Sequence, residues 1–124
     1  MSLIFLLLLQ ITCIAKADVV ITLPTQNSYV GERPEVKGNA NSGNVWVIVH
    51  PKGTDGYWVQ PTVNIENHAW NVIIYIGRSG SIDNGKHFEI LAISDPKEII
   101  SEGDVLSGWP DAKDTSKVIE VIRR

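Results

Sequence analysis

The sequence predicts an all-β protein, an antiparallel β-sandwich of about seven short strands with one short helix before the last strand. Three observations lead to this fold class. Short runs rich in valine and isoleucine recur along the chain, and several alternate with polar residues as half-buried strands do. Clusters of Gly, Pro, Asn, Asp and Ser separate these runs and indicate turns. Segments with helical periodicity are almost absent, which argues against a fold built on helices.

The first seventeen residues are predicted to be a secretory signal peptide. Residues 3–14 form an apolar run that is shorter than the about 20 residues of a transmembrane helix. Ala15, Lys16 and Ala17 then give the small-x-small pattern that precedes a cleavage site. We therefore expect cleavage after Ala17, a single domain over residues 18–124, and no membrane span after cleavage. The predicted location is secreted, periplasmic or at the cell envelope.

Cys13, the one cysteine of the chain, lies within this predicted signal. A lipid anchor on Cys13 is the alternative to simple cleavage, although Thr12 stands where a small residue normally precedes a lipidated cysteine. Cleavage after Ala17 would leave no cysteine, which excludes disulfides, thiol catalysis and cysteine-ligated zinc. The formal net charge of −3 argues against nucleic acid or an anionic membrane surface as a partner.

Seven segments of the sequence are predicted to be strands. They are residues 19–23, 35–40, 45–49, 57–60, 69–76, 87–94 and 118–122. Residues 45–49 are apolar at every position, which predicts a central strand that is covered on both faces, or one with a face in the core and a face under aromatic residues. In the 69–76 strand, Trp70 shares one face with Val72, Ile74 and Ile76, so we expect this tryptophan in the core. A tryptophan on a central strand is also typical of an immunoglobulin-like core.

The remaining segments are predicted to be loops, with one exception. Residues 77–85 are rich in glycine and indicate a loop. Asp95 and Pro96 fit the N-cap and first position of a helix, which predicts a short helix over residues 97–101. Residues 102–117 show no regular pattern.

The order of several motifs resembles a family of small extracytoplasmic immunoglobulin-like domains in bacteria and archaea, and it covers most of the chain from Val19 to Ile122. The motifs are Val36-Lys-Gly38, Val45-Trp-Val-Ile-Val-His-Pro51, Tyr57-Trp-Val-Gln-Pro61, Trp70, Tyr75-Ile-Gly-Arg78 and Gly85-Lys-His-Phe-Glu-Ile90. The most specific is Tyr57-Trp-x-Gln-Pro61 ahead of the Trp70 strand, whereas residues 94–117 depart from the pattern. The resemblance implies the fold and a binding or structural role, and it carries over no catalytic residues.

Sites for catalysis or metal binding are weakly indicated. Gly77-Arg-Ser79-Gly-Ser81 lacks the glycine that a nucleophile elbow needs two residues after the serine. The three histidines do not have the spacing of a helical zinc site, and Asp83-Asn84-Gly85 is shorter than an EF-hand calcium loop. Glu66, Glu89 and Glu120 could be named for glycoside hydrolysis, but nothing selects a pair. We therefore predict no enzyme activity, no cofactor and no metal site.

Aromatic residues carry the strongest functional hypothesis. Trp46, Tyr57, Trp58 and Tyr75 are candidates for an exposed binding platform, and Gln60 could add hydrogen bonds. The opposing interpretation is that these rings fill the core, where large aromatics contribute most.

The sequence thus predicts a monomeric, non-enzymatic binding or structural module that contacts an unknown protein at the cell envelope. The alternative is a carbohydrate-binding module that holds a cell-surface glycan on the Trp/Tyr cluster. Exposure separates the two: Trp58 and Tyr57 side by side on an open face would favour sugar binding, and burial of both would argue against it.

Overall fold

The computed structural model of the protein describes residues 18–41 and 43–124, and these form eleven β-strands and no helix. The strands are β1 (Val19–Leu23), β2 (Ser28–Val30), β3 (Glu35–Ala40), β4 (Val45–Pro51), β5 (Tyr57–Val59), β6 (Asn64–Glu66), β7 (Ala69–Ile73), β8 (His87–Pro96), β9 (Val105–Leu106), β10 (Ala112–Thr115) and β11 (Ile119–Arg123). The predicted signal peptide, including Cys13, lies outside the described residues. No helix of the described residues is long and apolar enough to cross a membrane.

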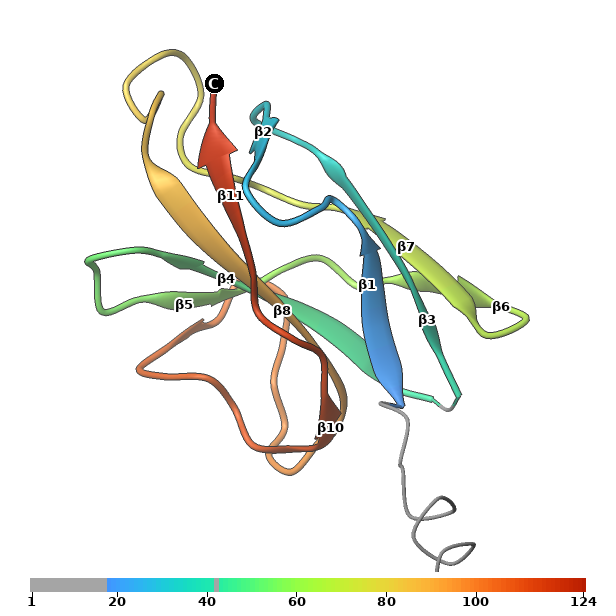
Figure 1. Ribbon diagram of the computed structural model, residues 1–124. Coiled ribbons are helices and arrows are strands. Elements are labelled where there is room, and N and C mark those ends of the chain that lie inside the picture. Colours follow the sequence, from blue (N-terminus) through green and yellow to red (C-terminus); the bar gives the residue numbers. More distant parts are fainter. Residues whose placement is uncertain (1–17, 42) are drawn as a thin grey trace, which may run out of the picture.

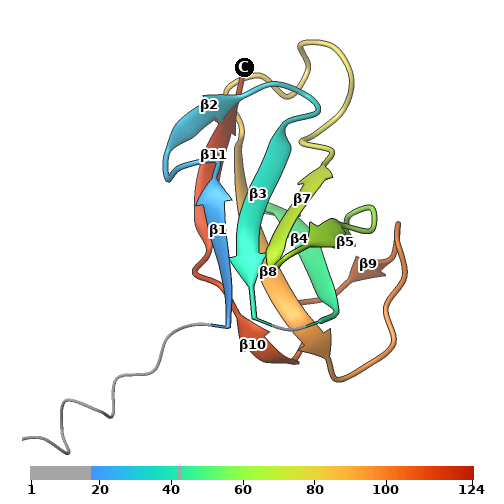
Figure 2. The ribbon, with the colours of Figure 1, turned by 90° about the vertical axis from the view of Figure 1, so that its right-hand side faces the viewer.

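The strands form two sheets that pack face to face, as Figure 1 shows from the side. One sheet has the order β1-β3-β7-β6, and Figure 2 views the molecule from its side. The other has the order β2-β11-β8-β4-β5-β9, and β10 pairs with the end of β8. Neighbouring strands of the described residues are antiparallel except β2 and β11, which run parallel. The prediction of an all-β sandwich is confirmed.

Alternation along the strands builds the main core between the two sheets. In β3, Val36, Gly38 and Ala40 are buried while the residues between them are exposed. The buried side chains of β3 pack against side chains from the other strands of both sheets. The buried members of this core are Val19, Val30, Val36, Ala40, Val45, Val47, Val49, Trp70, Val72, Ile74, Ile76, Phe88, Ile90, Ala92 and Val121.

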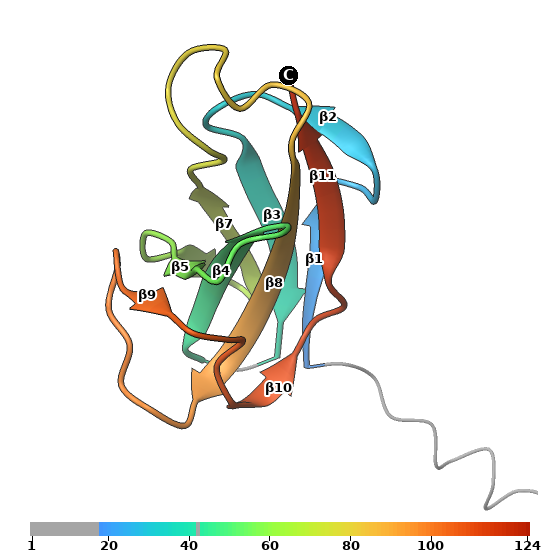
Figure 3. The same cartoon turned by 90° about the vertical axis from the view of Figure 1, so that its left-hand side faces the viewer.

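A second cluster covers the opposite face of the larger sheet. Its buried members are Ile48, Val59, Leu91, Ile93 and Ile100, and Trp46, Tyr57, Leu106, Trp109 and Ala112 pack against it. The segment between β8 and β11 supplies Ile100, Leu106 and Trp109, and Figure 3 shows this segment lying in front of the sheet. The strand predicted over residues 45–49 is therefore covered on both faces, as its unbroken apolar sequence indicates.

The predicted helix over residues 97–101 is wrong, because no described residue is helical. Asp95 has a φ of 52°, and Pro96 is still paired with Ala112 of β10, so β8 extends past the proposed helix start. The segment then turns, and the Ser101 N–H donates to the Asp104 carboxylate at 2.8 Å. Five residues are too few for a helix to form without tertiary support, and here Ile100 packs into the second cluster from a non-helical segment.

Trp70 is a core residue, as predicted, with 2% of its surface exposed. Its indole lies against Gly38 of the neighbouring strand β3. A Cβ atom at Gly38 would lie 2.0 Å from the Val20 carbonyl oxygen and 2.4 Å from the Trp70 ring. Glycine is therefore required here for close approach, since no larger residue leaves room for the indole.

Candidate functional site

A groove of about 1270 Å³ opens at one side of the sandwich. The β4–β5 hairpin forms one wall and the loop of residues 77–86 forms another; Figure 1 shows the hairpin projecting below this yellow loop. Val49 and Phe88, both members of the main core, line the groove. The groove thus joins an apolar interior surface to a rim of polar loop residues, which is the usual composition of a binding site.

Two aromatic side chains line this groove and remain about half exposed. Trp58 is 47% exposed and Tyr75 is 53% exposed. Strand alternation explains both positions. Tyr57 and Val59 face the second cluster, so Trp58 must point to the other side of β5. Ile74 and Ile76 are buried in the main core, so Tyr75 between them points outward.

Gln60 connects the backbones of the two aromatic residues. Its side chain is buried, its Nε2 donates to the Trp58 carbonyl at 3.3 Å, and its Oε1 accepts the Tyr75 N–H at 2.8 Å. A buried amide that is bonded at both ends fixes local geometry. Gln60 therefore holds the backbones of Trp58 and Tyr75 next to each other.

Arg33 fixes the ring of Tyr75. Its guanidinium carbon lies 3.7 Å from the centre of that ring, and its Nε donates to the Ile74 carbonyl at 3.2 Å. A cation above one ring face stabilises the ring in this position. Sequence reasoning missed Arg33 because the residue is 42 positions from Tyr75 and belongs to no motif.

The other two candidate aromatics lie on the opposite face of the larger sheet. Tyr57 stacks on His50 with ring centres 4.0 Å apart, and Trp109 meets Tyr57 edge-on at 4.8 Å. Trp46 packs against the same second cluster, and its Nε1 donates to the Asn44 side chain at 3.2 Å. The structure thus brings Trp58, Gln60 and Tyr75 together and places Tyr57 and Trp46 elsewhere.

Charged side chains form the rim of the groove at the end near the loop. The buried Asp83 carboxylate accepts hydrogen bonds from the Arg78 side chain at 2.8 Å and the Arg78 N–H at 2.7 Å, and Lys86 Nζ lies 3.1 Å away. These hydrogen bonds, those from Arg78 above all, hold the pKa of Asp83 well below its usual range. Glu120 bonds to His87 and to Lys52, and the hydrogen bond from His87 is the largest cause of its lowered pKa.

The glycine-rich loop is held in place by Arg123, which is 1% exposed. Its Nη1 donates to the carbonyls of Ile76 and Arg78, each at 2.8 Å, and its Nη2 donates to the carbonyl of Gly80. Glu32 lies 3.4 Å from the same guanidinium group. Sequence reasoning missed this residue because arginine is rarely buried unless it is paired.

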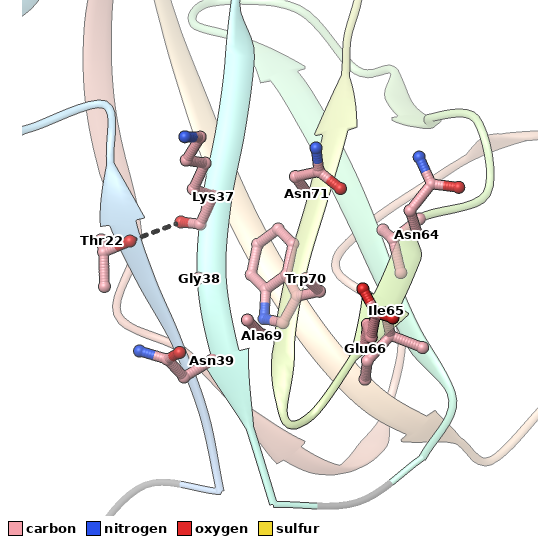
Figure 4. Close-up of a pocket in the computed structure, with 11 residues that line it drawn as sticks. Thr22, Lys37, Gly38, Asn39, Asn64, Ile65, Glu66, Ala69, Trp70 and Asn71 are labelled. Atoms are coloured by element: carbon pink, nitrogen blue, oxygen red, sulfur yellow. Dashed lines mark hydrogen bonds between the residues drawn. The ribbon is translucent and has the colours of Figure 1, made fainter.

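A second, shallower hollow of about 740 Å³ lies on the exposed face of the smaller sheet (Figure 4). Polar side chains of Thr22, Lys37, Asn39, Asn64 and Asn71 line it, and the Thr22 hydroxyl donates to the Lys37 carbonyl. Trp70, the one aromatic residue in its lining, is buried. This hollow offers hydrogen bonds but no exposed ring, so the groove is the better candidate site.

The described residues contain no cluster of three or more His, Cys, Asp and Glu side chains that could hold a metal ion. The histidines lie apart: His50 contacts Glu89 and Thr54, His87 contacts Glu120, and His68 contacts the Ala40 carbonyl. Ser79 and Ser81 lie in an exposed loop.

Neither a family model nor a curated protein matches this sequence.

Proposed function

We propose that this chain is an exported, non-enzymatic binding module and that the groove lined by Trp58 and Tyr75 holds a glycan. The observation that carries the proposal is the presence of two half-exposed aromatic side chains in one groove, linked through Gln60. Flat aromatic faces bind the apolar faces of sugar rings, and rings fixed before binding lose little conformational freedom when the ligand arrives. Export rests on the predicted signal peptide of residues 1–17.

We further propose that the sandwich is of the immunoglobulin-like kind. The constant-type immunoglobulin fold has one sheet with strands in the order A, B, E, D and a second sheet made of C, F and G. Assigning these letters in chain order to β1, β3, β4, β6, β7, β8 and β11 gives the A-B-E-D order of the smaller sheet and the G-F-C order of three neighbouring strands in the larger sheet, which also contains β2 and β5. Under this assignment β9 and β10 belong to an enlarged connection between the last two strands.

The environments of Asp83 and Glu120 oppose a role for either carboxylate as the general acid of a glycosidase. Glycoside hydrolysis needs one carboxyl group whose pKa is raised so that it remains protonated. The pKa values of Asp83 and Glu120 are both lowered, because each carboxylate accepts hydrogen bonds from basic side chains. Their environments thus oppose the protonation that a general acid requires.

Protein–protein contact at the cell envelope, the first expectation from the sequence, becomes the second candidate. Val105 of β9 pairs with Trp58 and is 52% exposed, so an apolar surface continues from the groove onto the edge of the larger sheet. Exposed tryptophan is also frequent among the residues that dominate protein interfaces.

Glycan-array binding of the purified protein and three variants tests the proposal. We expect Trp58→Ala and Tyr75→Ala each to weaken binding about tenfold, because a sugar–aromatic contact contributes on the order of 1.4 kcal/mol. Tyr29→Ala is the matched control, since Tyr29 is 61% exposed and does not line the groove. Absence of binding to every glycan, or equal binding by wild type and Trp58→Ala, would contradict the proposal.

A further inference from the structure

We infer that the glycan carries carboxylate groups and that Lys52, Arg78 and Lys86 hold them at the rim of the groove. This inference rests on the proposed function and adds the charge of the ligand to it. All three basic residues line the groove together with Trp58 and Tyr75.

The basic side chains at this rim outnumber the carboxylates that they contact. Asp83 is shared by Arg78 and Lys86, and Glu120 is shared by Lys52 and His87. Three permanent positive charges therefore face two negative ones at this end of the groove. Because one carboxylate balances one cation, this end of the groove retains positive charge in a protein whose net charge is −3.

The positive groups also lie nearer to solvent than the negative ones. The side chains of Arg78, Lys86 and Lys52 are 64%, 59% and 50% exposed. The side chain of Asp83 is 6% exposed and that of Glu120 is 21% exposed. A ligand at the rim thus meets the cations first, while the carboxylates beneath hold them in place.

The arrangement favours a carboxylated sugar over a dense polyanion or a nucleic acid. Glu102 also lines the groove and lies toward β5, where the Gly103 N–H bonds to the Val59 carbonyl. A ligand with negative charge along its whole length would meet Glu102 and be repelled there. A uronic acid residue instead places an apolar ring face and one carboxylate on a single unit, matching aromatic walls beside a basic rim.

Titration with two forms of one oligosaccharide tests the inference. An oligosaccharide of neutral sugars that ends in one glucuronic acid residue carries a single free carboxylate, and its methyl ester has the same sugar rings without charge. We expect the free acid to bind at least about tenfold more tightly at low salt, and this preference to shrink as ionic strength rises. Intrinsic tryptophan fluorescence and calorimetry measure both affinities.

Lysine variants locate the effect. Lys52→Gln and Lys86→Gln should each weaken binding of the free acid about two- to fivefold and leave binding of the ester unchanged, as expected for half-exposed ion pairs. Lys37→Gln is the matched control, because Lys37 is similarly exposed but lies on the smaller sheet outside the groove. A similar loss of affinity in Lys37→Gln would show that the charge effect is not localised to the rim and would overturn the inference.

The remaining outcomes distinguish this inference from the proposed function. Equal affinity for acid and ester, with both reduced by Trp58→Ala, would overturn the charge inference and leave glycan binding intact. Binding of poly-glutamate with no binding of any glycan would overturn both and favour an acidic protein partner.

Discussion

Gly38 is the residue at which the smaller sheet has the least space. The Val20 carbonyl and the Trp70 ring both lie where a side chain would begin, and neither backbone nor buried indole can move far. We expect Gly38→Ala to lower the free energy of unfolding by about 3 kcal/mol, as overpacked cores do. Urea unfolding measures this. Gly31→Ala is the control, since nothing lies within 4 Å of its added methyl group, and equal midpoints for the two variants would contradict the explanation.

Asp83 makes a stabilising contribution that depends on pH. Its pKa is lower in the folded protein than in the unfolded chain, so the folded state takes up a proton less readily. The stabilisation is therefore complete above the ordinary aspartate pKa of about 4, and it is lost as the pH falls toward the lowered value. We expect Asp83→Asn to lower the melting temperature clearly at pH 7 and progressively less below pH of about 4.

Thermal unfolding of wild type and Asp83→Asn across this pH range checks the sign. Asp55→Asn serves as the control, because Asp55 is exposed in the β4–β5 hairpin. A difference between wild type and Asp83→Asn that grew toward acid pH would mean that the ion pairs of Asp83 do not stabilise the fold.

The segment between β8 and β11 acts as a cover for one face of the larger sheet. Two neighbouring isoleucines of this segment differ in burial: Ile100 is 8% exposed and packs on the sheet, whereas Ile99 is 98% exposed. We expect Ile100→Ala to cost about 2–4 kcal/mol of unfolding free energy and Ile99→Ala to cost less than about 0.5 kcal/mol. Chemical unfolding of the two variants gives the comparison, and similar costs would show that the segment does not pack on the sheet.

Strands that bury side chains along several residues were predictable, and strands defined by pairing alone were not. The seven predicted strands correspond to β1, β3, β4, β5, β7, β8 and β11, with ends that differ by a few residues. The four others, β2, β6, β9 and β10, contain two to four residues each, which is too short for alternation to be recognised. β5 is equally short, but its aromatic residues between Gly56 and Pro61 indicated a strand. The two-residue β9 is defined by its pairing with β5, and the sequence of β9 itself does not indicate that pairing.

At the scale of the whole molecule, the sequence predicted the class of fold and part of the candidate site. Trp58 and Tyr75 were named because large aromatics are conspicuous, and strand alternation gives each its direction. The groove itself was not predictable, because it combines residues of the β4–β5 hairpin, the Gln60 segment and the 77–86 loop. These segments meet through sheet register and through the buried Arg123, neither of which leaves a local pattern.

The pairing of β2 with β11 has a consequence for when the protein can fold. Ser28 to Val30 lie beside Val121 to Arg123, and the Arg124 N–H donates to the Val30 carbonyl. The ribosome makes β2 some 90 residues before its partner, so β2 cannot pair in a growing chain until β11 has also been made. The nascent polypeptide therefore stays incompletely folded for longer. The proposed export would move the polypeptide through a translocation channel in an unfolded form.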